Sequence, residues 1–366
     1  MRKHYLDNIR WMTVVLVLIY HVFYMFNAAG VLGGVGSFSE TQWQDALLYF
    51  VYPWFMVLLF VVSGMSAKLA LDKRTDKEFI RSRTVKLLVP STLGLFAFQW
   101  IVGYFNLTAS GAADTIPAFL RYPVMVLSGI GPLWFIQLLW LFSLLLVLLR
   151  RIDPAGRLYA LGGKCNTAAL LLLFVPMWGA AQILNAPVIT TYRFGIYLLA
   201  FLLGYYVFSH DAVMDRVERL HVPLLIAAVV AGVAYTWYYF GTNYASDACL
   251  KHIFTAVYLW LAVLAVLGCG KAWFDRTSAF SAYMASASFG IYIVHYAVVI
   301  STCYLLKSRT ALTAAVVYPV AIVAVCALSP ALYELLRRIP LLRYLVLGIK
   351  KERTNERAMI KRAPEN

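Results

Sequence analysis

Two ionisable residues near the start of the chain have a spacing that suits chemistry on a long substrate. Arg10 and His21 are eleven residues apart, and an α-helix turns about 100° per residue, so both side chains lie on nearly the same helix face. The rise over this interval is ~16.5 Å, about half the hydrocarbon thickness of a bilayer. If the helix spans a membrane, Arg10 lies at one surface and His21 lies near the middle.

The two side chains suit the two ends of a phosphorylated donor with a long thin arm. A guanidinium can bind phosphate bidentately, and an imidazole can act as a general base on an acceptor hydroxyl. The pantetheine arm of coenzyme A has a comparable reach, so we expect a cavity that joins Arg10 to His21. Two alternatives remain open, because His21 can be a hydrogen-bonded packing residue and Arg10 can be an interfacial anchor.

A second histidine, His295, lies in a later hydrophobic segment, about ten residues from its inner end and therefore ~15 Å deep. This depth matches that of His21. His295 can orient His21, contact the acceptor or stabilise an oxyanion, or it can be a core histidine. No Asp or Glu is expected at this depth, so the buried carboxylate of a catalytic triad is not predicted, and Tyr, Ser, Asn, Gln or backbone remain as orienting groups.

The composition predicts that membrane helices position these residues. Of the 366 residues, 62% are hydrophobic and 13% are charged, whereas soluble domains carry about 25% charged residues. We predict an all-α bundle of about ten transmembrane helices, with one membrane domain over residues 1–350 and a short basic tail over 351–366. The predicted spans are 9–29, 47–67, 87–106, 132–149, 168–186, 194–209, 222–241, 252–270, 284–305 and 311–334.

The distribution of positive charge predicts the orientation. With the N-terminus inside, 27 of the 32 Lys and Arg residues flank the inner ends of the spans. We therefore predict that both termini are cytoplasmic. The net charge of +15 is explained by this topology, so no nucleic-acid partner is expected. The five cysteines show no metal-ligand spacing, and no metal site is predicted.

The stretch DNIRWMTVVLVLIYH, from Asp7 to His21, resembles the opening signature of the acyltransferase-3 superfamily of membrane acyltransferases. Further similar stretches follow in order at residues 60–64, 81–90, 133–135 and 288–296. The resemblance implies that Arg10 and His21 are required for O-acyl transfer from cytoplasmic acyl-CoA. It implies an envelope glycan or a lipid-linked acceptor, membrane lipids as neighbours, and no permanently bound cofactor. It suggests the plasma (inner) membrane of a bacterium.

The basic cluster Arg81, Arg83 and Lys86 is expected on the cytoplasmic side. It can hold the phosphates of the donor, or it can set the topology and contact anionic lipids. Lys86 stands where the family usually has Arg, which puts a bidentate contact at that position in doubt.

Four further residues are candidates for the lining of the site. Asp7 can orient the guanidinium of Arg10, or it can act as a favourable anion at a helix start. Ser63 and Trp134 lie in the family-like stretches, although an interfacial aromatic is the alternative for Trp134. Arg193 falls on the outer side, where it can meet an acceptor or serve as an anchor.

A transporter or permease is the rival interpretation, with His21 and His295 as proton-relay groups. Many transporters contain internal repeats, and this sequence shows none. The absence of a repeat favours the acyltransferase.

Overall fold

A computed structural model describes residues 3–31, 34–186 and 192–350. These residues form helices and connecting loops without a β-strand, apart from one isolated bridge between Asn185 and Arg193. Eight helices are long and apolar enough to span a bilayer, or up to ten if two bent helix pairs each count as one span. The predicted all-α membrane bundle is confirmed. The tail predicted at 351–366 lies outside the described residues.

The helices are numbered in chain order. They are α1 (His4–Met25), α2 (Ala46–Val51), α3 (Phe55–Leu71), α4 (Asp76–Arg83), α5 (Val89–Gly94), α6 (Trp100–Ala109), α7 (Ala118–Ser128), α8 (Trp134–Ile152), α9 (Arg157–Gly163), α10 (Thr167–Leu172), α11 (Phe174–Ala181), α12 (Phe194–Tyr206), α13 (Asp211–Arg219), α14 (His221–Tyr239), α15 (Asp247–Leu250), α16 (Ile253–Phe274), α17 (Ala279–Arg309), α18 (Ala314–Arg338) and α19 (Pro340–Leu345).

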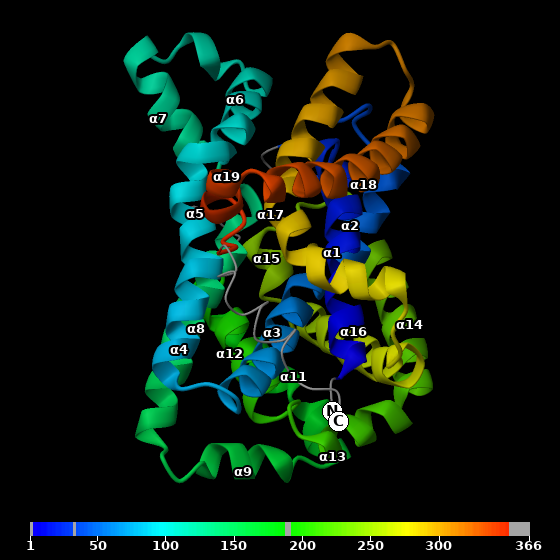
Figure 1. The fold of residues 1–366 in the computed structure, drawn as a ribbon. Coiled ribbons are helices and arrows are strands. Elements are labelled where there is room, and N and C mark those ends of the chain that lie inside the picture. Colours follow the sequence, from blue (N-terminus) through cyan, green and yellow to red (C-terminus); the bar gives the residue numbers. More distant parts are fainter. Residues whose placement is uncertain (1–2, 32–33, 187–191, 351–366) are drawn as a thin grey trace.

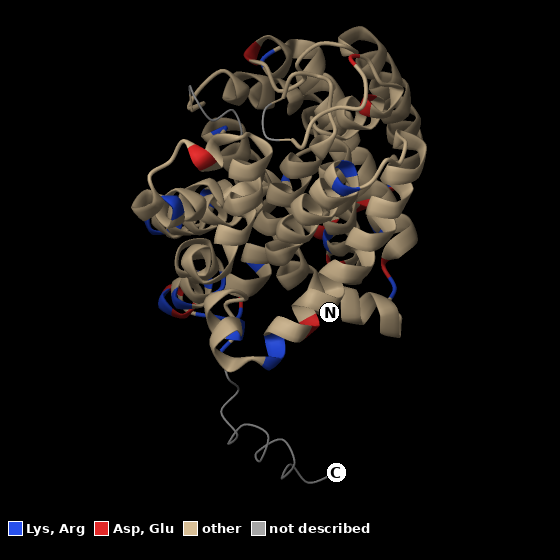
Figure 2. Ribbon diagram, turned by 90° about the horizontal axis from the view of Figure 1, so that it is seen from above, with Lys and Arg blue, Asp and Glu red and all other residues tan. Residues whose placement is uncertain are grey.

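The beginning of α1 lies at the same end of the bundle as α9 and α13, and α6 and α7 project from the opposite end (Figure 1). Helix α18 crosses in front of the bundle and leads into α19, which packs against α5. Seen along the bundle, most of the ribbon carries neither acidic nor basic residues (Figure 2). The buried side chains of the described residues are mainly hydrophobic.

Helix α1 is anchored to the connection between α16 and α17. The side chain of Asn8 donates to the carbonyls of Phe274 (2.6 Å) and Arg276 (2.8 Å). The backbone N–H of Tyr5 donates to Oδ1 of Asp275 (3.0 Å). These bonds fix the height of α1 relative to α17, against which α1 packs along its length.

The third predicted span begins earlier than expected. The sequence predicts a start at residue 87, but a continuous helical stretch runs over Asp76–Ala109 and begins at a capping box formed by Thr75 and Glu78. Two π-helical turns interrupt it, at Thr84–Leu88 and Leu95–Gln99. Pro90 cannot donate to a carbonyl of the preceding turn, which accounts for the widened turn before it. The basic cluster therefore lies on this helix and not in a loop beside it.

A sharp bend lies just before the fifth predicted span (168–186) and at the end of the sixth (194–209). The pair Arg157–Gly163 and Thr167–Ala181 is bent by 108°, and the pair Phe194–Tyr206 and Asp211–Arg219 is bent by 106°. The side chain of Asn166 caps the first of these breaks by accepting from the N–H of Ala169. Helix α12 has 13 residues, which gives a length of about 20 Å, shorter than a ~30 Å hydrocarbon core.

The sequence predicts no helix between the third and fourth spans, but this connection contains the 11-residue helix α7. Helix α7 packs against α6, where Gly103 faces the backbone of Met125 so closely that a Cβ atom at this position would collide with it. The hydropathy of 118–128 is interrupted by Arg121 and Pro123, which is why the sequence did not predict a helix here.

Helices α3 and α12 approach each other through small residues. A Cβ atom at Gly64 would collide with the carbonyl of Phe201, and one at Gly204 would collide with the carbonyl of Val61. Such close contacts are typical of helix packing in membranes. They hold the segment that carries Ser63 against the centre of the bundle.

Candidate active site

His21 on α1 and His295 on α17 face each other in the centre of the bundle. Their ring centroids are 5.1 Å apart, and Nε2 of His295 lies 3.2 Å from Nδ1 of His21. His295 is fully buried, and His21 is half-buried. The matched depth predicted for the two histidines therefore becomes a direct contact.

The hydrogen bonds of this pair determine which nitrogens carry protons. Nδ1 of His295 lies 2.6 Å from the carbonyl of Tyr292, and a carbonyl can only accept, so this nitrogen is the donor. In the neutral ring Nε2 of His295 is then an acceptor. Nδ1 of His21 lies 2.8 Å from the carbonyl of Val17, and it donates to that oxygen and toward His295. The lone pair of His21 is thereby left on Nε2.

Three tyrosine rings surround the imidazole of His21 edge-on. Tyr296 lies 5.0 Å away, Tyr20 5.2 Å and Tyr24 6.0 Å, measured between ring centroids, with interplanar angles of 79° to 85°. Edge-to-face packing of this kind is favourable. It holds the ring plane of His21 in one orientation.

Arg10 lies toward the beginning of the same helix and is held on both sides. Its guanidinium pairs with Asp7 (3.2 Å) and donates to Oγ of Ser66 (2.7 Å). The predicted contact between Asp7 and Arg10 is present. Ser66 was not predicted from the sequence, although it follows Ser63 by one helical turn on α3.

A cavity of about 400 Å³ opens beside Arg10. Its polar part is lined by four cations, and no Asp or Glu is among its lining residues in the described part of the chain. The apolar part is lined by side chains of α1, α3, α8 and α17. The cations are Arg10, Arg74, Arg83 and Lys86, and the apolar lining includes Val14, Leu59, Phe135, Leu139 and Phe289. A cavity with this lining suits an anionic ligand that has an apolar extension.

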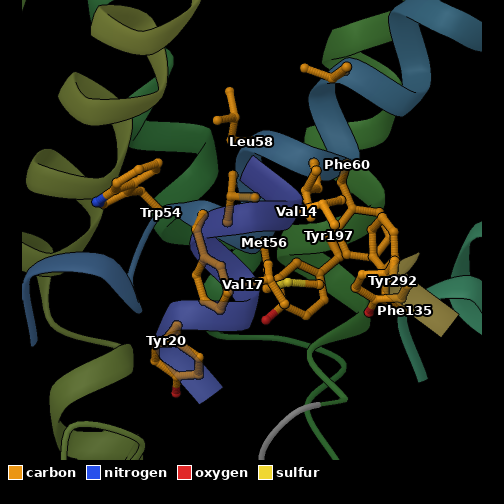
Figure 3. Close-up of a cluster of buried hydrophobic side chains, with 14 of the residues drawn as sticks. Val14, Val17, Tyr20, Trp54, Met56, Leu58, Phe60, Phe135, Tyr197 and Tyr292 are labelled. Atoms are coloured by element: carbon orange, nitrogen blue, oxygen red, sulfur yellow. The ribbon is translucent and has the colours of Figure 1, made fainter. Parts of the chain in front are cut away.

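The cavity stops short of the two histidines. It ends at Val14, Leu59, Phe135 and Tyr292, and neither His21 nor His295 is among its lining residues. Val17 is fully buried and lies on α1 between Val14 and Tyr20 (Figure 3), about one helical turn before His21 in the sequence. The expected open cavity from Arg10 to His21 is therefore interrupted by a layer of buried side chains around Val17 and Tyr292. Tyr292 contacts both the cavity and the histidine pair: it is one of the residues that line the cavity, and its carbonyl accepts a hydrogen bond from His295.

The family model for the acyltransferase domain matches residues 3–334. The chain belongs to the acyltransferase-3 family. It is similar to glucans biosynthesis protein C from Salmonella gallinarum (22% identical over 386 aligned positions) and from Salmonella schwarzengrund (23% over 387). In both comparisons 98% of each chain is covered. No solved structure matches the chain significantly.

Of the other residues predicted for the site of this acyltransferase, some line the cavity and others lie outside its lining. Ser63 lines the cavity together with Arg83 and Lys86, whereas Arg81 is exposed and is not among the lining residues. Trp134 is buried and stacks on Tyr197 at 5.3 Å, and its neighbour Phe135 lines the cavity instead. Arg193 also lies outside the cavity lining, at the beginning of α12.

Two functional candidates of this acyltransferase were missed by sequence reasoning. Arg74 precedes α4 and was counted only as part of the inner positive charge. Tyr292 lies within the family-like stretch at 288–296, but nothing in the sequence indicated that its carbonyl would fix His295. Among the described residues, no three His, Cys, Asp or Glu side chains gather in a way that would hold a metal ion.

Proposed function

We propose that this membrane acyltransferase moves an acyl group from cytoplasmic acyl-CoA to a hydroxyl of an envelope glycan or lipid-linked acceptor. The observation that carries the proposal is the hydrogen bonding of His21, which leaves the Nε2 lone pair as the free base. The name of the Salmonella relatives favours a glucan-like acceptor. The rival interpretation as a transporter is disfavoured, because the family match is to an acyltransferase domain.

The cationic part of the cavity is the proposed binding site for the phosphates of acyl-CoA. Arg83 and Lys86 are three residues apart on the helix, so their side chains lie on one face, and both line the cavity with Arg10. Arginine binds phosphate bidentately, whereas lysine acts as a point charge. Arg81 is left out of this proposed site because it is not among the residues that line the cavity.

His21 is the proposed general base for the chemical step. Its Nε2 removes the proton of the acceptor hydroxyl while the hydroxyl oxygen attacks the thioester carbonyl. The bond between carbonyl carbon and sulfur then breaks, and the thiolate of coenzyme A takes the proton back from Nε2. The products are an ester on the acceptor and free coenzyme A.

His295 is the proposed positioning residue for His21. When His21 is protonated at Nε2, its Nδ1–H still has an acceptor in the neutral Nε2 of His295. His295 is fixed in this state because its own Nδ1–H donates to the carbonyl of Tyr292. The pair thus performs with two imidazoles the orienting function that a carboxylate performs in a catalytic triad.

The reactive end of the donor reaches His21 only if the layer around Val17 and Tyr292 moves. Side-chain rotation and small helix shifts at such a layer are ordinary events in conformational gating. Binding of the donor phosphates by Arg10, which stands on the same helix as Val17, is the proposed trigger.

The proposal is tested by comparing cells that make the wild-type chain, the His21→Ala variant or no protein. Mass spectrometry of envelope glycans and lipids then detects the acylated product. We expect the product only with the wild type, because removal of a general base costs about 10²–10⁴ in rate. Coenzyme A is expected to stabilise both purified proteins against heat, since it binds only the folded state. Full acylation by His21→Ala would overturn the mechanism.

A further inference from the structure

The contact between His21 and His295 depends on how α17 is placed against α1. The hydrogen bond from His295 to the carbonyl of Tyr292 lies within α17 and moves with that helix, whereas the contact with His21 joins two helices. At 3.2 Å between the two nitrogens, this contact is at the long end of the hydrogen-bond range, so a small shift of either helix breaks it. The position of α17 at the level of His295 therefore has to be fixed closely.

The anchor near the beginning of α17 is far from this level. The side chain of Asn8 bonds to the connection just before α17, which begins at Ala279. Ile293, in the turn that leads to His295, lies about 21 Å further along the helix at 1.5 Å per residue. An anchor at that distance constrains the tilt of this turn only weakly. A second contact closer to His295 is needed.

A buried glutamine of the third span bonds to this turn of α17. Nε2 of Gln99 lies 2.8 Å from the carbonyl oxygen of Ile293, and these residues are 2% and 1% exposed. A carbonyl can only accept, so the amide group of Gln99 is the donor. The carbonyl oxygen has two lone pairs and can accept from Gln99 in addition to a donor of its own helix. Because Ile293 lies between Tyr292 and His295, the bond acts on the turn that holds the second imidazole.

Both sides of this bond are supported by the connection between α7 and α8. Gln99 ends the π-helical turn Leu95–Gln99, and such turns are frequent at functional sites. A Cβ atom at Gly129 would lie 2.2 Å from the carbonyl oxygen of Gln99, so the residue that follows α7 packs directly against this turn. On the side of α17, the hydroxyl of Tyr292 donates to the carbonyl of Pro132 (2.6 Å). The donor and the acceptor of the bond are therefore held by the same segment.

We propose that Gln99 is a positioning residue for the pair of His21 and His295. Its hydrogen bond to Ile293 fixes the rotation and height of α17 at which Nε2 of His295 accepts from Nδ1–H of His21. Gln99 is not among the described residues that line the cavity beside Arg10, so loss of its bond should act on the chemical step and not on donor binding. The inference rests on the proposed function and adds a residue that acts through the histidine pair.

The first test observes the histidine contact itself. Full-length protein with isotopically labelled histidine is placed in lipid nanodiscs, and the side-chain nitrogens are recorded by NMR. The signals of His295 are identified by their loss in His295→Leu. Methionine is similar in length to glutamine but cannot donate a hydrogen bond. In Gln99→Met we expect the Nε2 resonance of His295 to move toward that of an imidazole nitrogen without a donor, and an unchanged resonance would overturn the inference.

Gln137→Met is the matched control. The amide of Gln137 on α8 also donates to a backbone carbonyl, that of Ser91 (3.0 Å), but this bond connects α8 with α5 and not with α17. We expect Gln137→Met to leave the His295 resonance in place, although it also loses one hydrogen bond. An equal change in both variants would indicate general loosening of the bundle and refute the inference. Gln99→Asn, whose shorter side chain cannot reach Ile293, serves if Gln99→Met fails to fold.

The second test measures how fast acylated product accumulates in cells, per amount of folded protein. Gln99→Met should lower this rate about tenfold, since misplacement of a reacting group can cost up to about 10²-fold. The stabilisation of the purified variant by coenzyme A should stay as in the wild type. In the His295→Leu background the same substitution should lower the rate less than about twofold, because residues that act through one contact are not additive. A full tenfold loss in that background would assign Gln99 to general stability and overturn the inference.

The outcomes separate this inference from the proposed function, because the NMR comparison requires no acyl transfer. If the wild type forms no acylated product, the proposed function fails, while the resonance of His295 in Gln99→Met still decides whether Gln99 positions the pair. If the wild type forms the product and Gln99→Met forms it at the same rate, only the inference about Gln99 fails.

Discussion

Nε2 of His295 lies 3.2 Å from Nδ1 of His21, across 274 positions of the sequence. When both imidazoles are neutral, Nδ1–H of His21 donates to Nε2 of His295. Nδ1–H of His295 in turn donates to the carbonyl of Tyr292. The direction matters because it leaves the opposite nitrogen of His21 free for chemistry.

The first prediction concerns His295 as a positioning residue. In His295→Leu, Nδ1–H of His21 keeps only the carbonyl of Val17, so the ring and its protonated form lose a partner. We expect kcat to fall about 10- to 100-fold, corresponding to ~1.4–2.7 kcal/mol of transition-state stabilisation, with the KM for acyl-CoA unchanged. His295→Gln is the matched variant, because its side-chain oxygen can accept from Nδ1–H, and it should retain more activity. Equal losses in both variants would indicate a packing role.

The second prediction separates two arginines of the basic cluster. Arg83 lines the cavity, whereas Arg81 is exposed and lies outside it. Arg83→Gln should raise the KM for acyl-CoA about tenfold or more, since a hydrogen bond to a charged group contributes about 1.5–3 kcal/mol. Arg81→Gln should change it less than about twofold, as surface charges contribute little. Steady-state kinetics with a varied donor distinguish the two, and a larger effect at Arg81 would contradict this assignment.

The third prediction concerns the layer between the cavity and the histidines. Val17→Trp places a larger side chain in the layer and should block the arm of the donor, so transfer is lost while coenzyme A still stabilises the protein against heat. The control is Met12→Trp, because Met12 lies on the exposed face of the same helix. It should leave transfer near the wild-type rate. Normal transfer by Val17→Trp would show that the donor takes another route.

The fourth prediction concerns stability. A Cβ atom at Gly64 would collide with the backbone of α12, and overpacking typically costs about 1–3 kcal/mol. Gly64→Ala should therefore lower the melting temperature of the purified protein. Gly179→Ala is the control, since Gly179 is helical with nothing within 4 Å of the added atom and alanine favours the helix. Its melting temperature should be unchanged or higher.

Composition and helix geometry predicted the features that depend on one segment at a time. The membrane bundle, the position of Arg10 and His21 on a single helix and the pairing of Asp7 with Arg10 all follow from local spacing. The equal depth of His21 and His295 was also predictable, because depth depends only on the distance from a helix end.

Features that depend on packing between segments were not predictable. The contact of the two histidines requires α1 and α17 to meet at one rotation and height, which Asn8 and the carbonyls of Phe274 and Arg276 help to set. A hydropathy window also cannot distinguish a straight span from the bent pairs around Asn166 and His210. Val17 is hydrophobic whether it faces lipid or blocks a cavity, so the interruption of the path to His21 left no signal in the sequence.

The packed layer at Val17 also bears on the voltage across the membrane. A membrane protein that opened to both sides at once would let protons and salts leak and would dissipate the voltage that drives other transport processes. Because the cavity beside Arg10 ends at buried side chains, the voltage across the membrane falls over close-packed protein in the described part of the bundle.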